Sequence, residues 1–150
     1  MKKILTALIL TGILFSCKQP STVVVKAPID SLIANWNSSW NNHDSTGVSN
    51  FFAADVLLID DNLIATNAEE VAAKWIQPNI NVVSNFKTIK LQDWSTNERA
   101  GYTGKYESDV VVKDSVIAKP KGVFTVNWIK RNKGDWKITT ADIHAFVEKR

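Results

Sequence analysis

The hydrophobic period of this chain changes about halfway along its length, and this change constrains the fold more than any other feature. After Pro28, apolar residues recur every three or four positions, which predicts an amphipathic helix that ends near residues 41–44. From Phe86 onward, β-prone stretches alternate with short turns instead. These stretches cover residues 86–94, 99–112, 116–131 and 136–147. Helices followed by a run of strands indicate an α+β domain.

Smaller elements are expected between these two halves. Residues 44–52 predict a short second helix, and residues 56–64 predict a β-hairpin around an Asp-Asp-Asn turn. Thr66 and Glu69 have the spacing of a capping box, which predicts the start of a third helix. Pro78 is expected to end that helix.

The strands of the second half are expected to form an antiparallel meander, because turn sequences such as Lys113-Asp114 join them directly. Pro120 and Gly122 interrupt the third β-prone stretch. Proline lacks an N–H group for the ladder, and glycine weakens a strand, so this stretch should contain a bulge or a bend.

The N-terminal segment has the composition of an export signal. Lys2 and Lys3 precede an apolar run over residues 4–15, which is too short to span a bilayer core, and Cys17 follows it. This arrangement resembles the signal of bacterial lipoproteins, in which the cysteine is acylated and becomes the first residue of the mature chain. The resemblance implies a membrane-anchored lipoprotein of the bacterial cell envelope, located outside the cytoplasm. An ordinary secretory signal with a chance cysteine is the alternative.

The chain is accordingly divided into a signal peptide over residues 1–16, a lipidated tether over residues 17–27 and one domain over residues 28–150. Cys17 is the only cysteine, so an exported form has no internal disulfide, which favours lipidation. Loss of the leader with its two lysines lowers the net charge from +3 to +1. The remaining lysines are scattered among carboxylates, which argues against a nucleic acid partner.

Two short motifs carry a resemblance to a known family. Residues 51–56 read Phe-Phe-Ala-Ala-Asp-Val after a tryptophan-bearing helix, and residues 134–138 read Gly-Asp-Trp-Lys-Ile at the start of the last strand. Together they resemble the SnoaL-like, ketosteroid isomerase-like branch of the nuclear transport factor 2-like superfamily. The resemblance implies an α+β cone fold, in which N-terminal helices pack on a strongly curved, mainly antiparallel sheet and leave a cavity. The family includes isomerases, polyketide cyclases and dehydratases, so the fold does not define the function.

The resemblance makes Asp60 the first catalytic candidate. Ketosteroid isomerases place a carboxylate base at the matching position, although Asp60 also fits an ordinary solvated turn. The isomerases hold their oxyanion with a tyrosine and a protonated acid. Trp36 matches the tyrosine position, and residues 125–128 contain no carboxyl group. The isomerase apparatus is therefore incomplete.

Asp142 and His144 form a second catalytic candidate pair. Strict alternation along the last strand places them on the face that also carries Trp136 and Ile138. If this face lines the cavity, both polar groups belong to a ligand site. A bulge in the strand reverses the assignment, and a solvated strand end is the alternative interpretation.

Aromatic residues are the most abundant signal for a ligand site. A flat apolar ligand would favour several aromatic side chains around the cavity, and buried indoles also need partners for their N–H groups. Ordinary core packing is the alternative. The candidate ligand-binding residues are Trp36, Trp40, Trp75, Tyr102, Tyr106 and Trp128.

Other chemistries find little support in the sequence. His43 and His144 are the only histidines, and no zinc-type spacing occurs, so neither a metal nor a cofactor is expected. Gly-x-Ser-x-Gly and phosphate-binding glycine motifs are also missing from the sequence.

Three functions remain. The first is an anchored pocket protein that binds a small, largely apolar molecule without complete catalytic machinery. The second is a cofactor-independent isomerase, cyclase or dehydratase that uses Asp60, or Asp142 with His144, for proton transfer. The third is a homodimeric interaction module of the cell envelope, with Ile143 and Val147 in its interface.

Overall fold

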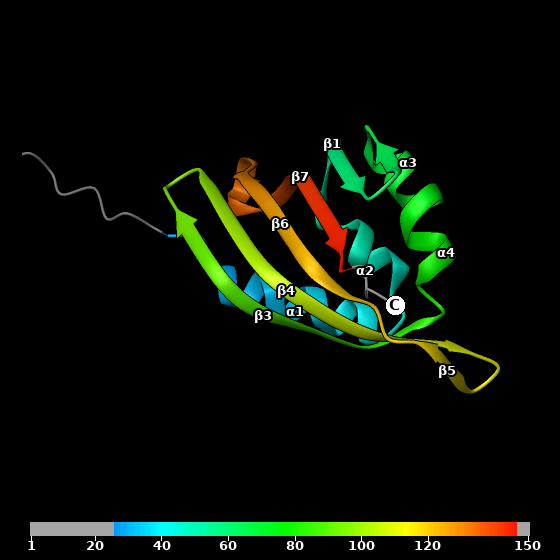
Figure 1. Cartoon of the computed structure of the whole chain (residues 1–150). Coiled ribbons are helices and arrows are strands. Elements are labelled where there is room, and N and C mark those ends of the chain that lie inside the picture. Colours follow the sequence, from blue (N-terminus) through cyan, green and yellow to red (C-terminus); the bar gives the residue numbers. More distant parts are fainter. Residues whose placement is uncertain (1–25, 147–150) are drawn as a thin grey trace, which may run out of the picture.

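The computed structural model describes residues 26–146, which form an α+β domain with helices on a strongly curled sheet (Figure 1). Helix α1 lies along one face of the sheet beneath β3 and β4, and α2, α3 and α4 gather near β1. This architecture confirms the expected fold class. The predicted signal peptide, Cys17 and nearly all of the predicted tether lie outside the described residues.

Helix α1 (Ile29–Asn41) follows the predicted apolar period, with Ile29, Ile33, Trp36 and Trp40 buried. It is tied to β3 by side-chain amides: Asn37 Nδ2 donates to Thr88 Oγ1 at 2.9 Å, and Asn41 Nδ2 donates to Phe86 O at 2.9 Å. These bonds hold the aromatic face of α1 toward the sheet.

The second helix is shorter than the sequence predicts. Helix α2 (Ser45–Ser49) begins at Asp44, whose side chain accepts a hydrogen bond from Gly47 N at 2.8 Å. Phe52 does not continue this helix but begins strand β1 (Phe52–Asp60). Strand β2 (Leu63–Ala65) returns antiparallel to β1, which confirms the predicted hairpin.

The third helical segment contains three successive parts: α3 (Ala68–Val71), the π-helical turn η1 (Ala72–Ile76) and α4 (Gln77–Asn79). Its cap lies one residue later than predicted, since Asn67 accepts from Glu70 N at 2.9 Å. Pro78 does not end the helix where it stands: α4 follows the π-helical turn directly, and the helical segment continues to Asn79. The wider turn just before α4 brings Trp75 to the sheet side.

The second half of the chain forms the sheet. Its strands are β3 (Val83–Ser95), β4 (Arg99–Val112), β5 (Ser115–Ala118), β6 (Lys121–Lys130) and β7 (Trp136–Ala145), with a 3₁₀ turn η2 (Asn132–Gly134) before β7. The strand order is β2-β1-β7-β6-β4-β3, with β5 paired to β4. All pairs are antiparallel except β1 with β7, which are parallel.

The interruption predicted at Pro120 and Gly122 separates β5 from β6. Lys113 and Asp114 both have positive φ, 49° and 61°, which is the geometry of a tight hairpin turn between β4 and β5. Gly122 pairs with Ala145 of β7, and a Cβ there would overlap the carbonyl of His144 and the ring of Tyr106. Only glycine therefore fits at position 122.

Strand β7 contains one bulge that changes which face each residue occupies. Asn127 pairs with Thr140, whereas the next residue, Trp128, pairs with Ile138, so Thr139 is an extra residue in the ladder. Before the bulge Trp136 and Ile138 are buried, and after it the buried position is Ala141. The inward face therefore passes from even to odd residue numbers.

Candidate functional site

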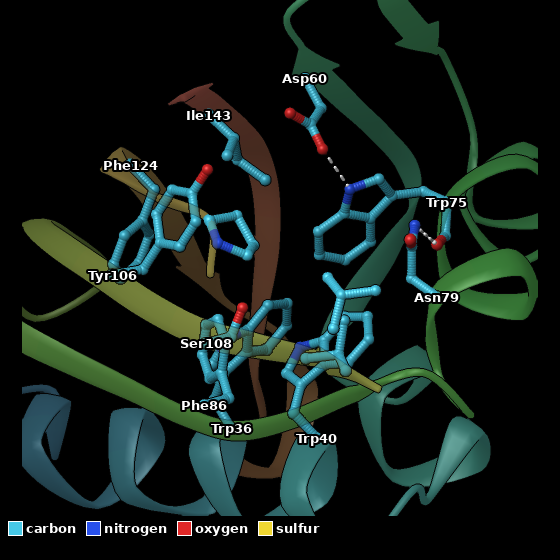
Figure 2. Close-up of a pocket in the computed structure, with 13 residues that line it drawn as sticks. Trp36, Trp40, Asp60, Trp75, Asn79, Phe86, Tyr106, Ser108, Phe124 and Ile143 are labelled. Carbon is cyan, nitrogen blue, oxygen red and sulfur yellow. Dashed lines mark hydrogen bonds between the residues drawn. The ribbon is translucent and has the colours of Figure 1, made fainter. Parts of the chain in front are cut away.

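A pocket lies between the concave face of the sheet and the helices, with a volume of about 210 Å³ (Figure 2). Its walls come from α1, the end of β1, the η1–α4 segment and strands β3, β4, β6 and β7. Six of its thirteen lining residues are aromatic. They are Trp36, Trp40, Trp75, Phe86, Tyr106 and Phe124.

The three pocket tryptophans pack into one rigid corner. Trp36 and Trp75 stack with ring centroids 6.1 Å apart, and Trp40 meets Trp75 edge-on at 5.1 Å. Phe86 continues this wall from Trp40 and stacks on Tyr106 at 6.4 Å. The side chains therefore hold one another in place around the hollow.

Asp60, at the end of β1, places a carboxylate at the pocket. Its Oδ2 accepts a hydrogen bond from Trp75 Nε1 at 2.6 Å, as Figure 2 shows. Burial raises the pKa of Asp60, and the neighbouring Asp61 raises it further, while the Trp75 hydrogen bond and His144 act in the opposite direction. Asp60 therefore lines the pocket from the end of β1, and its match to the isomerase base and its catalytic role stay predictions.

Tyr106, on β4, faces Asp60 across the pocket (Figure 2). Burial raises the pKa of Tyr106 to about 12, with contributions from the carboxylates of Asp60 and Asp61. Its phenol therefore stays protonated at neutral pH and is able to donate a hydrogen bond.

Three more polar groups touch the pocket. Ser108 is buried and contributes its hydroxyl from β4, and Asn79 donates from its amide to Trp75 O at 2.8 Å. Trp40 Nε1 is buried, and the described residues provide it with no hydrogen-bond partner. It lies beside Trp75, whose ring meets Trp40 edge-on.

The structure corrects the prediction that Asp142 and His144 line the cavity. Because of the Thr139 bulge, both side chains lie on the outer face, 53% and 56% exposed, and His144 Nε2 lies 3.1 Å from Asp142 Oδ1. Ile143 lies between them in the sequence and lines the pocket, so it faces inward and not outward with them, and the homodimer interface stays a prediction. Val147 lies outside the described residues.

Two of the predicted ligand-binding aromatics belong to the core instead. Tyr102 and Trp128 are each 3% exposed and do not line the pocket. Tyr102 packs on Phe124 with ring centroids 5.5 Å apart, so it supports the pocket wall from behind. Trp36, Trp40, Trp75 and Tyr106 do line the pocket.

Several pocket residues were not predicted from the sequence. Ser108 and Val110 share the inward face of β4 with Tyr106, so the alternation along this strand was a usable signal for both. Asn79 and Ile143 had no such signal, because a π-helical turn and a strand bulge place them.

Within residues 26–146, no three histidine, cysteine or carboxylate side chains cluster in a way that could hold a metal ion. The helices of that same part of the chain are too short or too polar to cross a membrane.

Comparison with known proteins identifies the fold. The sequence matches no protein-family model and no curated protein. A nuclear transport factor 2-like protein of unknown function from Shewanella oneidensis has 19% identity, with 77% of this chain and 95% of that chain covered and a TM-score of 0.66. A ketosteroid isomerase-like protein from Erwinia carotovora has 13% identity, coverage of 79% and 94%, and a TM-score of 0.68.

A nuclear transport factor 2-like superfamily protein from Salmonella enterica is similar to the same degree, with 13% identity, coverage of 81% and 91%, and a TM-score of 0.67. At such identities the likeness concerns the fold alone. The chain thus has the cone fold of nuclear transport factor 2-like proteins, with a half-barrel sheet curled around helices.

Proposed function

We propose that this protein binds a small, largely apolar molecule in the aromatic pocket. The observation that carries the proposal is a preformed hollow with aromatic walls and few polar groups, which is the usual composition of a ligand site. Its volume is about 210 Å³. Since an apolar cavity of about 150 Å³ accepts benzene, a ligand of one or two rings fits.

Binding is tested by following the indole N–H signals of the protein in ¹H–¹⁵N spectra during a titration with naphthalene. The signals of Trp40 and Trp75 should shift saturably, whereas the signal of Trp94, which is 47% exposed and does not line the pocket, should stay in place. Ser108→Phe fills the pocket and should weaken binding by about tenfold or more.

Val123→Phe is the matched control, because Val123 lies on the outer face of β6 beside the pocket residue Phe124. The control variant should bind like the wild type. If benzene, naphthalene and p-cresol all leave the pocket indole signals unchanged, the binding proposal is wrong.

The proposal includes attachment of this pocket to a membrane through Cys17, outside the cytoplasm. The charged start, the short apolar run and the single cysteine support it. Several acyl chains on one cysteine give a stable anchor, at about 0.8 kcal/mol per buried methylene. Cells fed radiolabelled palmitate should label the wild-type protein, and Cys17→Ser should abolish both the label and membrane sedimentation. Equal labelling of the two proteins would exclude the anchor.

An isomerase-type enzyme is the second candidate function, and Asp60 is the observation that favours it. A half-buried carboxylate with a raised pKa, held by Trp75 and facing the phenol of Tyr106, has the properties of a general base beside a hydrogen-bond donor. Asp142 and His144 do not share this environment, because they lie outside the pocket. Binding remains the first proposal, because the pocket residues of the described chain include one carboxylate and no second acid.

A further inference from the structure

We propose that the molecule bound in this pocket is an organic cation, a protonated or quaternary amine attached to one or two apolar rings. The inference rests on the proposed binding function and names the chemical class of its ligand. It combines two observations about the same cavity: the charge of its lining and the aromatic faces that surround it.

The described residues that line the pocket carry negative charge and no positive charge. Among the described residues that line it, Asp60 is the only charged side chain, and no lysine or arginine joins it. Asp61 follows in the same turn, and its backbone N–H donates to Ile143 O at 3.2 Å, which keeps it at the pocket rim. His144 lies 3.9 Å from Asp61 and 3.1 Å from Asp142 on the outer side. The rim therefore repels carboxylates and phosphates and attracts a positive charge.

Asp60 itself lacks the partners that a buried carboxylate needs. Trp75 Nε1 donates to Oδ2, and the described side chains provide no further donor to this carboxylate. A half-buried charge with one hydrogen bond is costly unless an opposite charge compensates it. The Trp75 bond also orients the carboxylate, so a bound ammonium would meet a fixed partner.

The aromatic walls suit the same kind of ligand. Figure 2 shows Trp75 below Asp60, Tyr106 and Phe124 on the opposite side, and Trp40 with Phe86 below. Ring faces attract cations, tryptophan most strongly, and the attraction grows when water is excluded. Neutral apolar ligands gain from the walls but not from Asp60, whereas an aromatic ammonium gains from both.

The experiment compares two molecules of nearly the same shape that differ in charge. Phenyltrimethylammonium is the cation and tert-butylbenzene is its neutral isostere. Their affinities are measured from the shifts of the Trp40 and Trp75 indole signals. The cation should bind at least about tenfold more tightly than the neutral isostere. Added salt should weaken the binding of the cation and leave the binding of tert-butylbenzene unchanged.

Asp60→Asn removes the charge but keeps an oxygen that accepts from Trp75. In this variant the cation should lose about tenfold in affinity, and tert-butylbenzene should bind as before. Asp55→Asn is the matched control on the same strand, because Asp55 is 75% exposed and does not line the pocket. It should leave both affinities unchanged.

Two results would overturn the inference: tert-butylbenzene binding as tightly as the cation in the wild type, or a cation affinity that Asp60→Asn leaves unchanged. In both cases the binding proposal survives, because at least one of the two probes still occupies the pocket. If neither molecule binds, the binding proposal fails together with the inference. The salt dependence in the wild type decides the question even where the variant does not fold.

Discussion

Replacement of Trp36 by alanine is expected to lower the free energy of unfolding by about 3–5 kcal/mol. Trp36 is 6% exposed, and its ring contacts Trp40, Phe51, Phe52 and Trp75 with centroid separations between 5.4 and 6.2 Å. Its loss would leave a cavity where α1, the start of β1 and η1 meet, and the neighbouring rings cannot all close it. Urea unfolding followed by circular dichroism gives the difference without depending on tryptophan emission.

Trp94→Ala is the matched control for this prediction. Trp94 is 47% exposed and covers Gly101 on the outer face of the sheet. This substitution should lower the free energy of unfolding by about 1 kcal/mol, because much of the Trp94 ring already contacts water. If both variants lose the same free energy of unfolding, the packing of Trp36 against its aromatic neighbours does not hold the helices to the sheet.

Replacement of Asp60 by asparagine is expected to slow proton exchange at a bound ketone by about 10²–10⁴-fold, if the protein acts as an isomerase-type enzyme. The probe is 2-indanone, a two-ring ketone with acidic C–H bonds, and deuterium incorporation is followed by NMR. Only the ionised carboxylate takes a proton. Burial raises the pKa of Asp60 above 3.8, so the wild-type rate should rise with pH through the range above that value and then level off.

A control variant and a stability measurement separate this result from a general loss of structure. Asp142→Asn alters an exposed carboxylate outside the pocket and should leave the rate unchanged. The stability of the wild type should also decrease as the pH rises from 3.8 through the folded pKa of Asp60, because burial disfavours the charged form, and Asp60→Asn should lack this decrease. Equal exchange rates in the wild type and Asp60→Asn would exclude the enzymatic role of Asp60.

The fold was largely predictable, because its main elements have strong local patterns. The apolar period of α1 and the long β-prone stretches from residue 86 onward indicate the correct element types in the correct order. The errors lie where one residue alters the geometry. Phe52 has the spacing of a helical residue but begins β1, since it packs edge-on against Trp36 and Trp75 at the start of the sheet.

The site was less predictable, because irregular backbone places several of its residues. Asp60 and the tryptophans of α1 lie in the pocket as expected. The face of β7 depends on the Thr139 bulge, which arises from its pairing with β6 and has no local signature. Trp75 and Asn79 likewise depend on a π-helical turn beside Pro78. Strict periodicity therefore holds along α1 and β4 but fails where the bulge and the π-helical turn place pocket residues.

The position of β7 within the sheet has a consequence for how the chain folds during synthesis. β7 is the last described strand, yet it lies between β1 and β6, and Leu57 pairs with Thr140 across most of the domain. The β1–β2 hairpin therefore has no place in the sheet until almost the whole polypeptide has emerged from the ribosome. Such distant pairing slows folding. A chain with this topology therefore completes its sheet only when synthesis is nearly finished.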